Sequence, residues 1–259
     1  MEFEDLTGYK ITLNGHPKRI ISLVPSQTEL LYHFGIEPIA QTIFCVHPKE
    51  NFKKSIKIGG TKKLNIDKIK QLKPDLIIGN KEENQKEQIE ELRKYFPVWL
   101  SDIYSITHSN HMILEIGKMT DSKDKAVLLS NQISDGFKDL NIQNNIAKTV
   151  LYLIWRNPFM AAGRNTFIND ILIKAGYENA LINKDSRYPE LTPAEIVELK
   201  PSEILLSSEP YPFKEEHIQE LQTLLPKVKI KLVDGELFSW HGPRLLETVN
   251  YLKSMKSSL

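Results

Sequence analysis

Two stretches of the chain share one pattern of apolar and polar positions. Residues 66–82 read IDKIKQLKPDLIIGNKE and residues 193–209 read PAEIVELKPSEILLSSE. In each stretch, apolar residues at three- to four-residue spacing predict a short amphipathic helix, and a Lys-Pro pair ends it. The apolar run that follows is typical of a strand covered on both faces in a parallel sheet. The spacing from the proline to the closing glutamate, Glu82 or Glu209, is the same in both, so the chain repeats one unit.

A second pair of segments supports this repeat. Residues 30–40 (LLYHFGIEPIA) and 171–180 (ILIKAGYENA) each read as a helix end that is stopped by a glycine, Gly35 or Gly176. A chain that repeats these features in both halves is predicted to form two similar lobes. The fold class is therefore α/β, with a mostly parallel sheet in each lobe.

The region between the two repeats predicts helices rather than a flexible linker. One helix is expected at about residues 108–118, and a second at residues 122–140, where apolar side chains recur every three to four positions. The second helix is about 28 Å long at about 1.5 Å per residue, which is enough to join two lobes rigidly. The predicted organisation is an N-terminal lobe, one long backbone helix within a connecting helical region, and a C-terminal lobe, at residues 1–107, 108–140 and 141–259.

The ends of the chain add two local predictions. Residues 19–24 (RIISLV) read as a strand, and Ser26 with Glu29 has the spacing of a capping box for the helix that follows. Near the C-terminus, a strand at 229–233, a loop at 234–241 and a final helix at 243–255 are expected.

Composition limits the function classes. Of 259 residues, 41% are hydrophobic and 26% charged, which is ordinary for a globular protein, and a net charge of +1 gives no support to nucleic-acid binding. A single cysteine, Cys45, excludes an internal disulfide and a multi-cysteine metal site. No apolar run approaches the roughly 20 residues of a membrane span. The acidic start, MEFED, lacks a signal-peptide core, so the expected location is cytoplasmic, or periplasmic or cell-surface if a leader has been removed.

Aromatic, imidazole and arginine side chains follow several predicted strands. Ligands of open α/β sheets bind beyond the carboxyl ends of the strands, so these loops predict a platform for a large flat ligand. Arginines on the platform would pair with carboxylate or phosphate groups, and His47 or His241 is a possible metal ligand. Trp155 and Phe238 equally suit the core of a lobe, and the sequence leaves this open. The candidate residues are His47, Trp155, Arg156, Phe238, Trp240 and Arg244.

An enzyme is a weaker hypothesis. Cys45 and His47 are two residues apart, which on a strand places both on one face and permits a nucleophile and a base. No third orienting group can be assigned, and the sequence holds no HExxH, GxSxG or phosphate-binding glycine loop. A buried, unreactive cysteine is favoured instead.

Several of these motifs together resemble a known family. KRIISLVPSQTELLYHFG, then IGGTKKLNIDKIKQLKPDLIIGN, a long helix and a second lobe resemble class III substrate-binding proteins of ABC importers, the cobalamin and iron-siderophore receptor group of the helical-backbone metal-receptor type. The resemblance runs from about Lys18 to the C-terminus. It implies two α/β lobes joined by one helix, a ligand cleft between them and little closure on binding. It also implies ligand contacts from the loop before the final helix, namely Glu236, Leu237, Phe238, Ser239 and Trp240.

The resemblance further implies that one acidic residue on each lobe docks onto arginines of a membrane permease. Glu82 and Glu209 are expected to fill this role as exposed carboxylates at matching corners, although most glutamates are simply solvated surface groups.

The leading hypothesis is a monomeric, non-enzymatic binding protein without an intrinsic cofactor. Its ligand would be a metal chelate, resembling cobalamin, heme or an iron-siderophore, that it delivers to an ABC permease dimer. The alternative is a cytoplasmic protein of the same fold that handles a corrinoid or another metal complex without a transporter. An enzyme using Cys45 and His47 is the third hypothesis.

Overall fold

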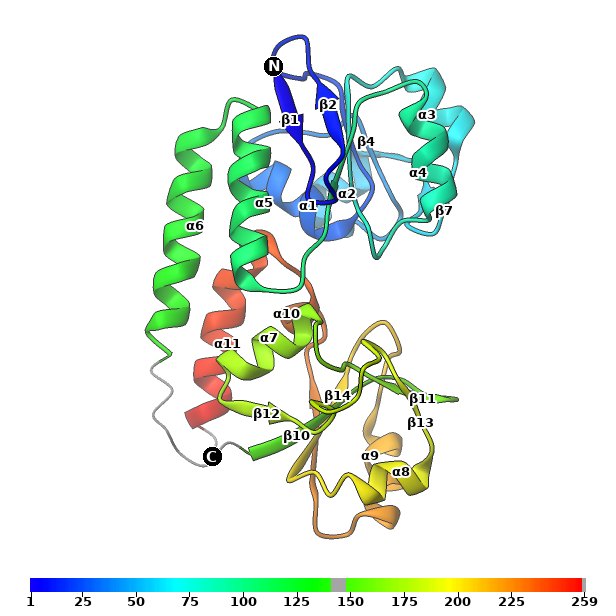
Figure 1. Cartoon of the computed structure of the whole chain (residues 1–259), viewed down its shortest axis with the longest axis vertical. Helices are drawn as coiled ribbons and strands as arrows, with labels where there is room; N and C mark the ends of the chain where they lie inside the picture. The colour runs from blue at the N-terminus through cyan, green and yellow to red at the C-terminus, as the bar shows by residue number, and fades with distance from the viewer. Residues whose placement is uncertain (141–147, 258–259) are drawn as a thin grey trace. The chain divides into compact units, whose positions relative to one another are not determined.

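A computed structural model of the chain describes residues 1–140 and 148–257, and these form two compact α/β units (Figure 1). Unit 1 consists of residues 1–103, 107–134 and 240–246, and unit 2 of the described residues of 104–106, 135–239 and 247–259. Helix α6 (Lys123–Lys138) passes from unit 1 into unit 2 after Ser134. The predicted two-lobed α/β fold is confirmed. The boundaries at 107 and 140 stay a prediction, and residues 141–147 lie outside the described part.

Unit 1 is built on a five-stranded sheet in which all neighbouring strands are parallel. The strand order is β5 (Ile56–Lys57), β4 (Ala40–Gln41), β3 (Ile20–Ser22), β8 (Leu76–Asn80) and β9 (Val98–Ser101). Two antiparallel hairpins are added, β1 (Glu2–Glu4) with β2 (Lys10–Thr12), and β6 (Gly59–Gly60) with β7 (Lys63–Leu64). The helices before α6 are α1 (Pro25–His33), α2 (Lys49–Lys54), α3 (Ile66–Leu72), α4 (Lys86–Arg93) and α5 (Ile106–Met119).

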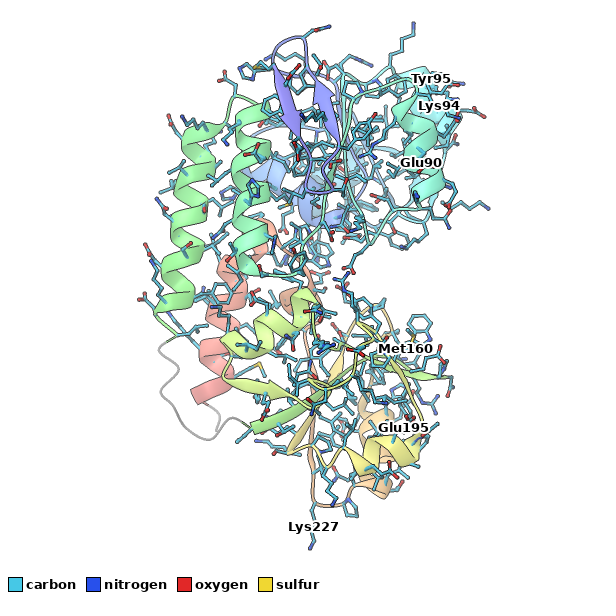
Figure 2. All side chains as sticks on the ribbon, in the orientation of Figure 1. Glu90, Lys94, Tyr95, Met160, Glu195 and Lys227 are labelled. Carbon is cyan, nitrogen blue, oxygen red and sulfur yellow. The ribbon has the colours of Figure 1, made fainter. Side chains whose placement is uncertain are left out.

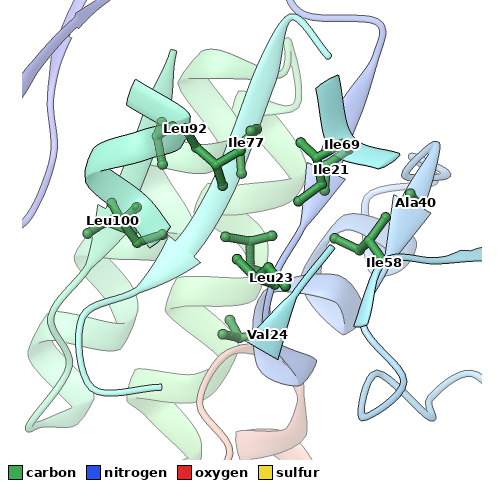
Figure 3. Packing of buried hydrophobic residues seen from close by; sticks show 12 residues of the cluster. Ile21, Leu23, Val24, Ala40, Ile58, Ile69, Ile77, Leu92 and Leu100 are labelled. Carbon is green, nitrogen blue, oxygen red and sulfur yellow. The ribbon is translucent and has the colours of Figure 1, made fainter. Parts of the chain in front are cut away.

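The core of unit 1 lies where α3 and α4 cover this sheet. Ile21 and Ile77 come from the adjacent strands β3 and β8, and Ile69 and Leu92 come from α3 and α4 (Figure 3). All five residues of β8 are buried. This confirms the buried strand that the apolar run after Lys-Pro predicts.

Unit 2 has a mixed sheet centred on β10 (Lys148–Trp155). Three strands run parallel to β10. β12 (Tyr177–Asn179) and β14 (Glu203–Ser207) both pair with β10, and β15 (Lys229–Val233) pairs with β14. β11 (Phe159–Ala161) and β13 (Glu190–Leu191) extend it as antiparallel neighbours. The remaining helices are α7 (Phe167–Lys174), α8 (Pro193–Glu198), α9 (Glu215–Leu224), α10 (Glu236–Ser239), the 3-10 turn η1 (Gly242–Arg244) and α11 (Leu245–Ser257).

The two predicted repeats are equivalent down to individual hydrogen bonds. The N-cap of α3 is Asn65 and that of α8 is Thr192, and each side chain accepts the backbone N–H three residues further on. Lys73 and Lys200, which precede the prolines, both have left-handed backbones with φ of 47° and 46°. A left-handed residue followed by proline cannot continue the helix, so the chain turns there into β8 or β14.

The glycine stops are equivalent as well. Gly35 has φ of 81° and its N–H donates to the carbonyl of Tyr32, and Gly176 has φ of 86° and donates to Ile173. Glycine adopts this left-handed conformation without a Cβ penalty, so both helices end where the sequence predicts.

The predicted capping box in unit 1 is wrong. α1 begins at Pro25, and its N-cap residue makes no side-chain cap bond. Ser26 is buried, and its Oγ accepts the backbone N–H of His241 instead (3.3 Å). The Glu29 carboxylate binds the guanidinium of Arg244 (2.7 Å). Both side chains that suit a local cap are therefore used by contacts distant in sequence.

No helix within residues 1–140 and 148–257 is long and apolar enough to cross a membrane.

The cap of α8 gives a test of the repeat. Thr192 and Glu195 form a full capping box at the start of α8, where Figure 2 labels Glu195, and its carboxylate accepts the N–H of Thr192 (2.8 Å). We expect Thr192→Ala to lower the free energy of unfolding by about 1 kcal/mol, because an N–H of the first turn loses its acceptor. Thr192→Ser keeps the hydroxyl and should lose far less. Urea unfolding followed by circular dichroism measures both, and equal losses would contradict the capping role.

Candidate functional site

Parallel pairing brings the carboxyl ends of the strands to one edge of the sheet in each unit, and the candidate residues lie on the loops that leave this edge. In unit 1, His47 follows β4 and Glu82 follows β8. In unit 2, Trp155 ends β10, Glu209 follows β14 and α10 follows β15. This edge is where ligands of open α/β sheets bind.

Trp155 is a partly exposed aromatic residue held in a fixed orientation. Its side chain is 39% exposed, and its ring meets the ring of Tyr211 edge to face with centroids 5.6 Å apart. The Tyr211 hydroxyl lies 3.0 Å from Nε2 of His217, while Nδ1 of His217 accepts the N–H of Lys214 (2.8 Å). Because Nδ1 accepts, Nε2 of the neutral ring carries the proton and donates to Tyr211. Of the two alternatives for Trp155, the structure shows the surface position.

Arg156, the next residue, already has a carboxylate partner. Its Nε and Nη2 donate to the two Glu220 oxygens at 2.8 and 3.0 Å. This bidentate pairing raises the pKa of the guanidinium. A ligand carboxylate at Arg156 would have to compete with Glu220.

The predicted loop at 234–241 contains the short helix α10, and part of it belongs to the core of unit 2. Phe238 is fully buried between the rings of Tyr152 (5.1 Å) and Tyr251 (6.3 Å), and Leu237 is 9% exposed. The core alternative for Phe238 is therefore the one the structure shows. Glu236 and Ser239 are partly exposed, so they are the residues of α10 that offer surface to a ligand.

Trp240 belongs to unit 1, where its ring contacts two other candidate residues, His47 and Arg244. Its ring lies edge to face with the imidazole of His47 (5.5 Å), and the Arg244 guanidinium lies 5.2 Å from it. Arg244 is 8% exposed and binds Glu29 through two nitrogens, at 3.1 and 2.7 Å. Trp240 is also only 8% exposed, so His47 contributes most of the surface of this trio. These three residues, which the sequence assigns to one platform, do lie together. Two of them, Trp240 and Arg244, are buried against their neighbours and offer little surface to a ligand.

His241 is poorly suited to bind a metal. It is only 4% exposed, so a metal chelate at the surface does not reach it. Burial lowers the pKa of its imidazole to about 4, so the ring is neutral at physiological pH, and a neutral imidazole could bind a metal only with further ligands beside it. Within the described part of the chain, no group of three or more His, Cys, Asp or Glu side chains is placed to hold a metal ion.

Cys45 is likewise buried. Its sulfur lies 3.0 Å from the Thr28 hydroxyl, which donates to it, and 3.1 Å from that of Thr42. Burial raises the pKa of the thiol, so the nucleophilic thiolate is disfavoured. The side chain fills the core beside α1.

The two corner glutamates have the same local geometry. Asn80 ends β8 and its Oδ1 accepts the N–H of Glu82 (2.8 Å), and Ser207 ends β14 and its Oγ accepts the N–H of Glu209 (3.4 Å). Both glutamates are partly buried rather than fully exposed as expected. The Glu209 carboxylate also accepts a hydrogen bond from Ser239 (2.7 Å), which fixes its direction.

Sequence reasoning missed two aromatic residues at this edge. Phe44 is 52% exposed, and its ring covers Gly60 so closely that a Cβ there would lie 2.9 Å from it. Its run of apolar neighbours reads as strand, yet β4 ends at Gln41 and leaves Phe44 on the loop. Tyr211 lies two residues after Glu209, on the loop that follows β14. Its place just beyond a strand end is the feature of the sequence that could have identified it.

Comparison with known proteins identifies the family. Residues 20–225 match the family described as Periplasmic binding protein. The chain belongs to this family. It is a binding protein and not an enzyme, which removes the Cys45 and His47 hypothesis.

Individual relatives align with nearly the whole chain. The uncharacterized ABC transporter substrate-binding lipoprotein YvrC of Bacillus subtilis is 26% identical, covering 96% of this chain and 83% of that protein. The fold matches the periplasmic vitamin B12-binding protein BtuF of Vibrio cholerae (TM-score 0.79, 18% identity, 93% and 97% covered). It also matches the periplasmic heme-binding protein RhuT of Roseiflexus sp. RS-1 (TM-score 0.78, 20% identity, 92% and 97% covered).

The different burial of the two tryptophans predicts different effects of truncation. We expect Trp240→Ala to lower the free energy of unfolding by about 3–5 kcal/mol, because it removes a buried ring. Trp155→Ala, at a partly exposed position, should cost about 1 kcal/mol or less. Chemical denaturation of both variants beside the parent measures the difference. Equal losses would mean that the described packing of Trp240 is wrong.

Proposed function

We propose that this chain is the substrate-binding protein of an ABC importer and that its ligand is a metal chelate of the cobalamin, heme or ferric-siderophore class. The observation that carries the proposal is the braced, partly exposed Trp155 at the carboxyl end of β10, on the edge where the fold binds ligands. The vitamin B12- and heme-binding functions in the relatives' names support the ligand class. YvrC, named as a transporter lipoprotein, supports the coupling to import.

The chemistry of this edge suits a broad, mostly apolar ligand. An aromatic face stacks on a corrin, a porphyrin or a catecholate ring without a directional hydrogen bond. Tyr211 and His217 hold Trp155 in place before the ligand arrives, which lowers the entropy lost on binding. In unit 1, the imidazole of His47 is the group that can hydrogen-bond the chelate or coordinate its metal.

The proposed function also assigns roles outside the ligand site. Glu82 and Glu209, one on each unit, would bind arginines on the two halves of a permease dimer. Their matching backbone hydrogen bonds support this role, because a two-fold permease surface requires two equivalent acidic corners. Import places the chain outside the cytoplasmic membrane, which differs from the location that the first residues alone favour.

The ligand proposal is tested at Trp155. We expect Trp155→Ala to weaken chelate binding by roughly 5- to 150-fold, because burying one aromatic face contributes on the order of 1–3 kcal/mol. Trp155→Phe should retain most of the affinity. Absorption titrations with cyanocobalamin, hemin and a ferric hydroxamate measure the dissociation constants.

A matched control is Tyr95→Ala. Tyr95 is an exposed aromatic (55%) that projects from unit 1 just before β9, at the amino end of that strand (Figure 2). Its loss should leave affinity unchanged. Unchanged affinity in Trp155→Ala for a chelate that the parent binds would remove Trp155 from the site.

Docking is tested by charge reversal. Glu82→Lys with Glu209→Lys should abolish binding to the permease and its stimulation of ATP hydrolysis. Chelate affinity should fall less than in Trp155→Ala, since stacking on the aromatic ring rather than these carboxylates is proposed to hold the chelate. The control reverses Glu90 and Glu216, which are exposed glutamates on α4 and α9. If both double variants lose stimulation equally, the effect is general charge and the corners have no special role.

A further inference from the structure

Positive charge is concentrated in one stretch of unit 1. Residues 49–73 hold nine lysines against two carboxylates, Glu50 and Asp67, while the net charge of the whole chain is only +1. The rest of the chain is therefore net acidic. These lysines belong to α2, β5, the β6–β7 hairpin and α3.

These elements are neighbours along the outer strand of the sheet. β5 is the last strand and pairs only with β4 within the described residues. α2 leads into β5 and has no buried residue. The β6–β7 hairpin follows β5 directly, with Lys63 paired opposite Gly60.

Four exposed lysines on these elements, namely Lys49, Lys53, Lys54 and Lys63, make no ion pair with another residue of the described ranges. Other lysines of the stretch do have partners: Lys70 pairs with Glu91, and Lys62 donates to the Glu82 carbonyl. No carboxylate of the described ranges neutralises these four charges, so they are available to an anionic partner outside the chain.

Two large aliphatic side chains are exposed beside these lysines. Ile56 on β5 is 42% exposed, and Ile43 after β4 is 48% exposed. The N–H of Ile43 donates to the carbonyl of Gly59, which ties Ile43 to the base of the β6–β7 hairpin (2.9 Å). We define the basic edge as Lys49, Lys53, Lys54, Lys63, Ile43 and Ile56.

We propose that the basic edge binds the surface of a bilayer that contains anionic phospholipids. Lysines near such a surface are attracted by its negative potential, and exposed aliphatic side chains among them enter the headgroup region. A nucleic acid fits less well, because residues 49–73 contain no arginine, the residue best suited to bidentate phosphate and base contacts. The proposal does not depend on the identity of the chelate or on docking to a permease.

Co-sedimentation with lipid vesicles tests this proposal. The full chain is mixed with vesicles of equal parts phosphatidylglycerol and phosphatidylcholine, and separately with phosphatidylcholine alone. We expect binding to the anionic vesicles only. The triple variant Lys53→Glu, Lys54→Glu, Lys63→Glu should lower the partition coefficient by roughly 100-fold or more, at about fivefold or more per lysine.

The matched control reverses three exposed lysines elsewhere, Lys10, Lys123 and Lys227, of which Lys227 projects freely from unit 2 (Figure 2). It has the same net charge as the patch variant and should keep most of the binding. Ile56→Ser should weaken binding of the otherwise unchanged chain more at high salt than at low salt. Salt screens the lysines, so the exposed aliphatic side chain then contributes a larger share of the binding. Equal losses in the two triple variants, no binding to anionic vesicles, or patch-dependent binding to an oligonucleotide but not to lipid would each overturn the proposal.

Discussion

Parallel pairing of β8 with β3 and of β14 with β10 is the constraint on which the rest of the structure depends. It makes these paired strands of each sheet point the same way. The loops that leave their carboxyl ends therefore lie along one edge of the sheet in each unit. The Lys-Pro corner makes this pairing possible, since a left-handed lysine before proline ends the helix and lets a fully buried strand begin. His47, Trp155, Glu82 and Glu209 reach the same edge of their units for this reason.

The two candidate arginines are each paired with a carboxylate of the protein. Arg244 binds Glu29 and Arg156 binds Glu220, each through two nitrogens. The first pair is largely buried, and removing one partner of such a pair leaves an uncompensated charge. These arginines therefore serve mainly to hold the loops in place. Under the proposed function, the aromatic surface would therefore contribute more than charge to holding a chelate.

The sequence predicts the features that depend on neighbouring residues. The glycine stops at Gly35 and Gly176 and the buried strands after each Lys-Pro pair follow from local propensity and spacing, and the structure shows them where expected.

The feature that was predicted wrongly and the alternatives that the sequence left open depend on distant partners. Ser26 has the spacing of a cap, yet the group that binds it, the N–H of His241, lies 215 residues away. Phe238 and Trp155 look alike in sequence, and only the packing of Tyr152 and Tyr251 around Phe238 separates a core ring from a surface one. No local pattern contains that information.

We propose that the strand-end edge carrying Trp155 holds a metal chelate. The most direct measurement is to incubate the full chain with cyanocobalamin, hemin or a ferric hydroxamate, remove free ligand by desalting, and record the visible absorption spectrum. We expect one of these chelates to stay with the protein near equimolar ratio, and we expect Trp155→Ala to lose it while Tyr95→Ala retains it. Protein that emerges without a visible band after all three, or that retains a chelate equally in both variants, would show that Trp155 does not mark a chelate site.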